Sequence, residues 1–174
     1  MSVKKISFKI GDLTIGGDSP ILIQTMCNTS TNDIEGSVKQ CEDVIAQGAD
    51  LVRLTTQGVR EVNSLAEIKS ILRGKGINTP LVADVHFSSK VAIAAASVAE
   101  KVRINPGNFA KEHSQALSEF DIFISECKKY GTAVRIGINH GSLGERITNL
   151  YGNTPKGMMM ADLERMDMCI ERNF

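Results

Sequence analysis

The sequence lacks several features that mark common classes of protein. It carries no net charge, with 20 Lys plus Arg against 20 Asp plus Glu, so its surface as a whole does not favour nucleic acid or membrane as a partner, and neither is expected. No apolar run approaches the ~20 residues of a membrane span. Residues 1–10 lack the apolar centre of a signal peptide. We therefore expect a cytoplasmic protein in which any positive potential is local.

Cysteine patterns typical of metal or cluster sites are also missing. The chain has four cysteines, Cys27, Cys41, Cys127 and Cys169, and no two of them form a C-x-x-C pair. Cys41 and Cys127 fall on apolar faces of predicted helices. We therefore expect these thiols to be buried and unreactive, and we expect no metal site in this chain. Only Cys27, at the end of a predicted strand, stands out.

Strand-like and helix-like segments alternate along the chain. After a hairpin signal in residues 6–17, strands are predicted at residues 21–28, 51–56, 81–87, 101–105 and 133–139, each followed by helical periodicity. Helix starts are predicted at Asn32 or Asp33, at Ser88 and at Thr154-Pro155. Strands about 30 residues apart indicate βαβ units and a parallel sheet.

Two α/β architectures fit this order. One is a (β/α)8 TIM barrel with about five of its eight units present, and the other is a five-strand doubly wound sheet. No G-x-G-x-x-G follows the first predicted strand, which weakens a dinucleotide-binding version of the second. For the barrel, residues 1–19 are expected to form the hairpin and residues 20–174 a partial (β/α) barrel.

Polar residues fall on one face of every predicted strand. Period-2 alternation groups Gln24 with Met26, Arg53 with Thr55, Asp84 with His86, Lys101 with Arg103 and Asn105, and Arg135 with Gly137 and Asn139. The opposite faces are mostly Val, Ile, Leu, Ala and Phe. A doubly wound sheet would bury apolar residues on both faces. One polar face therefore favours a barrel lumen, with a site at the carboxyl ends of the strands.

Three arginines occupy the same point of three strands. They lie in Val52-Arg53-Leu54, Val102-Arg103-Ile104 and Val134-Arg135-Ile136. A guanidinium stays charged and carries five donors, and burying it unpaired costs several kcal/mol. Asp84 is the single carboxylate on this face, so excess positive charge predicts a phosphate or diphosphate ligand. Purely structural arginines, paired with Asp84 and with backbone carbonyls, are the alternative.

Three further side chains are candidates for the same site. His86 can donate a hydrogen bond to a phosphate oxygen. Asn105 and Asn139 can each fix an oxygen or a hydroxyl group. All three lie on the same face, and farther along the same predicted strands, as Asp84, Arg103 and Arg135 respectively.

Four motifs carry a resemblance to a known family. They are Gln24-Thr25-Met26-Cys27-Asn28-Thr29, Val82-Ala83-Asp84-Val85-His86-Phe87, Arg103-Ile104-Asn105-Pro106-Gly107-Asn108 and Arg135-Ile136-Gly137-Ile138-Asn139-His140-Gly141-Ser142-Leu143. In this order they resemble 4-hydroxy-3-methylbut-2-enyl diphosphate synthase, the iron–sulfur oxidoreductase of the non-mevalonate pathway of isoprenoid (terpenoid) biosynthesis. Leu54-Thr55-Thr56-Gln57-Gly58 further resembles the longer, three-domain form of that family.

The resemblance implies a fold, a reaction and a set of site residues. An N-terminal TIM barrel would bind 2-C-methyl-D-erythritol 2,4-cyclodiphosphate, and a C-terminal domain would carry a [4Fe-4S] cluster supplied with electrons by ferredoxin or flavodoxin. Arg53, Arg103 and Arg135 would clamp the diphosphate. His86, Asn105 and Asn139 would complete the pocket, with Asp84, the expected catalytic residue, near the carbon skeleton of the substrate.

The chain departs from the family at its end. The last three barrel units, a lysine on the next strand and the cluster-ligating cysteines are not in the sequence. We expect a fragment that is inactive alone. We also expect it to be marginally stable, to self-associate, or to form a half-barrel held together by crystal or dimer contacts, with a homodimer as one form. Two other functions remain open: a pteroate-synthase-like barrel transferase acting on a phosphorylated small molecule, and a non-catalytic phosphate-binding module.

Overall fold

The fold was obtained as a computed structural model that describes residues 6–109 and 113–174. Its strands are β1 (Ser7–Ile10), β2 (Leu13–Gly16), β3 (Gln24–Met26), β4 (Leu51–Thr55), β5 (Leu81–Asp84), β6 (Lys101–Ile104) and β7 (Ala133–Ile136). Its α-helices are α1 (Ile34–Ala46), α2 (Val59–Gly74), α3 (Ser89–Ala96), α4 (His113–Tyr130), α5 (Glu145–Tyr151) and α6 (Pro155–Glu171). Two short 3₁₀ helices, η1 (Pro106–Asn108) and η2 (His140–Ser142), follow β6 and β7.

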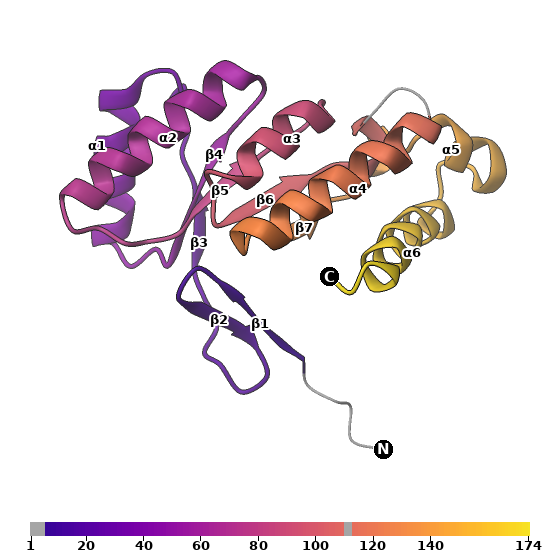
Figure 1. The fold of residues 1–174 in the computed structure, drawn as a ribbon, viewed down its shortest axis with the longest axis horizontal. Helices are drawn as coiled ribbons and strands as arrows, with labels where there is room; N and C mark the ends of the chain where they lie inside the picture. The colour runs from indigo at the N-terminus through magenta and orange to yellow at the C-terminus, as the bar shows by residue number, and fades with distance from the viewer. Residues whose placement is uncertain (1–5, 110–112) are drawn as a thin grey trace.

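The five-stranded sheet is parallel, and its strands lie in chain order, β3-β4-β5-β6-β7. A doubly wound sheet would reverse its strand order at a switch point, and this sheet does not. Helices α1 to α4 follow one another along the sheet, with α1 and α2 at one end and α3 and α4 beside β5 to β7 (Figure 1). The sheet order therefore agrees with the predicted partial (β/α) barrel.

Helix starts follow the predicted capping residues. Asp33 accepts a hydrogen bond from the backbone N–H of Gly36 at 3.1 Å, and it is Asp33 rather than Asn32 that caps α1. Ser88 caps α3, and Thr154 caps α6 immediately before Pro155. An N-cap oxygen satisfies a backbone donor that the helix itself leaves without a partner. These three helices therefore begin where the sequence indicates.

The apolar core lies between the sheet and its covering helices. Val52, Leu54, Ala83, Val102 and Ile104 of the strands are buried there with apolar residues of α1 to α4. Because side chains alternate along a strand, the intervening residues point to the opposite face. That face carries the polar side chains predicted to line the lumen.

The hairpin of β1 and β2 covers the amino end of this sheet. Ile10 is fully buried and packs with Leu51 and Val82, which lie near the starts of β4 and β5. Figure 1 shows the hairpin beneath the strands, away from the ends from which the helices depart. The carboxyl end is thus left for polar groups. The division at residue 19 stays a prediction.

The strands are shorter than the sequence indicated. The first was expected at 21–28 and spans Gln24–Met26, and the last was expected at 133–139 and ends at Ile136. Strand pairing stops where the neighbouring strand turns away toward its helix. The alternation of residues in one strand does not reveal where its neighbour ends. Helix α5 was not predicted, since Ile147 is its one buried residue and gives no periodic signal. No helix in the described ranges is long and apolar enough to cross a membrane.

Candidate anion-binding site

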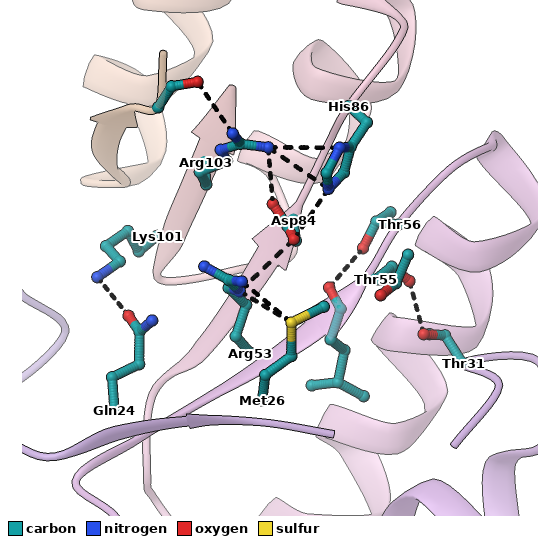
Figure 2. Close-up of polar contacts among 12 residues, drawn as sticks. Gln24, Met26, Thr31, Arg53, Thr55, Thr56, Asp84, His86, Lys101 and Arg103 are labelled. Carbon is teal, nitrogen blue, oxygen red and sulfur yellow. Dashed lines mark hydrogen bonds and ion pairs between the residues drawn. The ribbon is translucent and has the colours of Figure 1, made fainter. Parts of the chain in front are cut away.

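Asp84 is the centre of the polar face. Asp84 is 1% exposed. It ends β5, which lies between β4 and β6 in the sheet. Its carboxylate oxygens lie 3.5 Å from Arg53 Nε, 3.4 Å from Arg103 Nη1 and 3.1 Å from His86 Nε2 (Figure 2). A carboxylate this deeply buried must be paired to remain charged. One side chain therefore organises groups from three strands.

Arg103 is the most enclosed of the three arginines, with its side chain 8% exposed. Besides Asp84, it donates from Nη2 to the carbonyl oxygen of Gly137 at 2.9 Å. Its Nη1 also lies 3.5 Å from His86 Nδ1. Since His86 Nε2 faces Asp84, a proton on Nε2 leaves Nδ1 free to accept from Arg103. The guanidinium is thus held in one orientation by acceptors from three elements.

Arg53 is held more loosely. Its Nε and Nη2 lie 3.3 and 3.0 Å from the thioether sulfur of Met26 on the neighbouring strand β3. A thioether is a weak acceptor, and the Arg53 side chain is 26% exposed. Its ion pair with Asp84 is long, at 3.5 Å. Arg53 therefore keeps donor capacity for a ligand.

Lys101 adds a fourth cation that the sequence placed on this face. It is buried on β6, and its Nζ donates to Gln24 Oε1 of β3 at 2.7 Å, as Figure 2 shows. Burial first, and then the positive charges of Arg135 and Arg53, lower the pKa of Lys101 to about 8. A bound anion would offset both effects.

Arg135 and Asn139 are exposed. Arg135 pairs in register with Arg103 across β6 and β7, yet it has no carboxylate within ion-pair distance among the residues that the structure describes. Asn139 lies in the loop after β7 and accepts, through its backbone carbonyl, from the N–H of Ser142. Both side chains are thus available to a ligand at this edge.

Asn105 directly follows β6 and connects two loops. It is buried, its Nδ2 donates to Ser142 Oγ at 2.8 Å, and its Oδ1 accepts from the N–H of Gly107 at 3.2 Å. A Cβ atom on Gly107 would lie 1.7 Å from the carbonyl oxygen of Ser142. Asn105 and Gly107 therefore join the loop after β6 to the loop after β7, and Ser142, a residue of the fourth motif, takes part through its side chain.

The charges of this face do not balance. Arg53, Lys101, Arg103 and Arg135 contribute four positive charges, and Asp84 is the single carboxylate paired with them in the described residues. Guanidinium groups form strong, often bidentate hydrogen bonds to phosphate oxygens. The arrangement is therefore suited to an anion with several charges.

The predicted site residues divide into two groups. Arg53, Asp84, His86 and Arg103 form one connected cluster, whereas Asn105, Arg135 and Asn139 lie toward β7 and the loops that follow β6 and β7. Lys101 shares a face with Arg103 by the alternation of β6, but alternation alone does not indicate its contact with Gln24. Met26 is the other unexpected partner, and its contact with Arg53 needed the register of β3 and β4.

The four cysteines do not gather at one point. Cys27 and Cys41 lie together beside β3 and α1, and Cys127 and Cys169 are on α4 and α6 toward the β7 end of the sheet. Within residues 6–109 and 113–174 no group of three or more metal-ligating side chains converges. A [4Fe-4S] cluster, normally held by four cysteines, does not fit these residues.

Known proteins match this chain over nearly its whole length. Residues 5–174 match the family described as the GcpE TIM-barrel domain. A Parabacteroides distasonis protein is 45% identical over 183 residues, and one from Phocaeicola vulgatus is 46% identical over 182, each covering 95% of this chain and 30% of the relative. One from Chlamydia trachomatis serovar L2 is 38% identical over 188 residues, covering 98% and 31%.

All three relatives are named 4-hydroxy-3-methylbut-2-en-1-yl diphosphate synthase (flavodoxin). The chain spans about 30% of the length of these curated relatives. The match confirms the predicted barrel architecture, because the family is defined by a TIM-barrel domain and the sheet has the strand order of one. This chain belongs to the GcpE TIM-barrel domain family.

Proposed function

We propose that this chain is the substrate-binding barrel of an enzyme that reductively opens 2-C-methyl-D-erythritol 2,4-cyclodiphosphate to 4-hydroxy-3-methylbut-2-enyl diphosphate. The observation that carries the proposal is the cluster of cationic side chains around the buried carboxylate of Asp84, on the polar face of the sheet. The relatives of this chain carry the name of that synthase. The enzyme would be an oxidoreductase of isoprenoid biosynthesis acting in the cytoplasm.

The arginines and the lysine would hold the diphosphate. Arg103, fixed by Asp84 and Gly137, offers a preoriented donor. Arg53, with its weak thioether contact, and the exposed Arg135 have donors to spare. Bringing phosphate oxygens among these groups would relieve the mutual repulsion of four cations. Binding would therefore be driven by charge-assisted hydrogen bonds.

Asp84 and His86 would act beside the diphosphate. Asp84 keeps two guanidinium groups in place and would lie near the carbon skeleton of the bound substrate. His86, whose Nε2 faces Asp84 and whose ring also faces Arg103, would complete the pocket beside the diphosphate. Asn139 would bind from the loop after β7, and Asn105 would keep that loop close.

Electrons for the reduction would come from outside this barrel. The names of the relatives include flavodoxin, which favours flavodoxin over ferredoxin as the donor. The [4Fe-4S] cluster would be held by residues other than those described, since the described cysteines lie apart. The inactivity of this chain alone and its association into a homodimer stay predictions.

Isothermal titration of the 174-residue chain with the methylerythritol cyclodiphosphate tests the proposal. Arg103→Ala should weaken binding at least about tenfold, because a charge-assisted bond to phosphate is worth roughly 1.5–3 kcal/mol. Arg60→Ala, which removes an exposed arginine of α2, is the matched control and should bind as the unmodified chain does. Equal affinities for a folded Arg103→Ala and Arg60→Ala would contradict the proposal.

A parallel titration with inorganic diphosphate separates the rival functions. A module that only binds phosphate would hold inorganic diphosphate as tightly as the cyclic substrate. A transferase resembling pteroate synthase would bind neither preferentially and would require a different phosphorylated ligand. We expect the cyclodiphosphate to bind more tightly, because Asp84 and Asn139 can contact its carbon skeleton and hydroxyl groups.

A further inference from the structure

Two cysteines of the core have no part in the proposed function. Cys27 directly follows β3, and Cys41 lies in the middle of α1 on the face that packs against the sheet. Both are free thiols, 5% and 0% exposed, and their sulfur atoms are 3.8 Å apart. A disulfide needs about 2.05 Å, so the two sulfur atoms, already in contact, would have to move closer together to bond.

The two thiols differ in their surroundings. A hydrogen bond from Cys41 lowers the pKa of Cys27, which favours the Cys27 thiolate. The same hydrogen bond, together with burial, raises the pKa of Cys41, which therefore keeps its proton. Cys27 is 5% exposed, and its sequence neighbours Met26 and Asn28 are exposed, so Cys27 lies one residue from the surface in the chain. A thiolate beside a second thiol is the arrangement found in redox-sensing pairs.

Cys27 is also connected to the arginine cluster through the backbone. Its N–H donates to the carbonyl oxygen of Arg53 at 2.9 Å. The residue before it, Met26, contacts the Arg53 guanidinium through its sulfur. Moving Cys27 toward α1 would therefore disturb its own hydrogen bond to Arg53 and the neighbouring contact of Met26 with the guanidinium.

We propose that Cys27 and Cys41 form a redox pair whose oxidation to a disulfide by a peroxide weakens anion binding at Arg53. The Cys27 thiolate attacks one peroxide oxygen and becomes a sulfenic acid, releasing hydroxide. The Cys41 thiol then displaces that oxygen as water, so two thiols lose two electrons and hydrogen peroxide is reduced to two waters. Thiol reductants of the cytoplasm would reverse the bond. The expected effect on affinity rests on the proposed anion site, whereas formation of the disulfide is independent of that site.

Peptide mass analysis after treatment with hydrogen peroxide and trapping of free thiols tests the bond. We expect a peptide pair joined through Cys27 and Cys41, reversed by dithiothreitol, in the unmodified chain and in a Cys169→Ala control. Cys41→Ala, which leaves a small apolar side chain in the core, should instead accumulate oxidised Cys27 without the linked pair. If Cys27 and Cys41 stay reduced while Cys169 is oxidised, the proposal is overturned.

Titration of the same samples with inorganic diphosphate tests the link to the site. Oxidation should weaken binding about fivefold, the low end of usual coupling between sites, and Cys41→Ala should abolish this change. If the disulfide forms and the affinity is unchanged, the link to Arg53 is wrong. If the reduced chain binds neither inorganic diphosphate nor the cyclodiphosphate, it is the proposed function that fails, since the mass analysis is independent of binding.

Discussion

Strands β6 and β7 carry the same three-residue motif and use it differently. Arg103 of β6 has a side chain that is 8% exposed and is held by Asp84, His86 and the carbonyl of Gly137. Arg135 of β7 is its register partner, is exposed and has no carboxylate partner among the described residues. The difference comes from neighbours, because β6 lies between two strands and β7 has one.

The comparison shows how one motif can serve stability in one strand and binding in the next. The free side of β7 borders an apolar cavity lined by Val134, Ile136, Met166 and Phe174, and no strand of the described chain covers it. Arg103 is part of the packed structure, so its loss should affect both folding and ligand affinity. Arg135 should affect ligand affinity alone.

The largest loss of stability is expected on removing the carboxylate of Asp84, which pairs with Arg103 of β6. Asp84→Ala leaves the buried Arg103 without its ion pair, and removing one partner of a buried pair costs about 3–5 kcal/mol. Urea unfolding monitored by circular dichroism measures this loss. The matched change Glu145→Ala removes an exposed carboxylate near β7 and should alter the free energy of unfolding by less than about 0.5 kcal/mol. Equal losses would mean that the Asp84 network contributes nothing special to stability.

The next effect is a pH dependence set by Lys101. Its pKa of about 8 in the folded chain lies below the 10.5 of an ordinary lysine, so the unfolded chain binds more protons between these pH values. The free energy of unfolding should therefore rise by on the order of 3 kcal/mol from pH 8 to 10.5. Lys101→Met should remove this rise. Urea unfolding of the unmodified chain and of Lys101→Met at pH 7.5 and 10 measures this difference. If the free energy of unfolding changes equally with pH in both, the lowered pKa of Lys101 is contradicted.

Gly137 links the two strands and offers a smaller test. A Cβ atom there would lie 2.2 Å from Arg103 Nε, so Gly137→Ala forces the held guanidinium to move at a cost of about 1–3 kcal/mol. Gly141→Ala is the control in the following turn, where a Cβ atom meets nothing within 4 Å. Thermal unfolding should separate the two variants. A Gly137→Ala chain as stable as Gly141→Ala would show that Arg103 is free to shift.

Much of the fold follows from local features of the sequence. Capping residues such as Asp33 and Ser88, the period-2 alternation and the 30-residue rhythm predict a parallel sheet with one polar face, because each depends on short-range geometry. The same alternation placed Arg53, Asp84 and Arg103 on one face. These aspects need no knowledge of distant contacts.

The remaining features depend on contacts between distant residues. Asn105 donates to Ser142, 37 positions away, and Lys101 donates to Gln24, 77 positions away. Arg135 is exposed because β7 has a single neighbouring strand, β6, among the described residues. The contact between Cys27 and Cys41 needed the packing of α1 on β3. Alternation in one strand carries no information on such pairs.

The most direct test of an anion site shared by β6 and β7 is the affinity of Arg135→Ala for inorganic diphosphate, measured by titration beside its free energy of unfolding. We expect binding to weaken about tenfold, as loss of a charge-assisted bond predicts, while stability stays within about 0.5 kcal/mol of the unmodified chain. An Arg135→Ala chain that binds diphosphate as tightly as Arg60→Ala would show that the edge arginine has no role in binding, and would contradict the shared site.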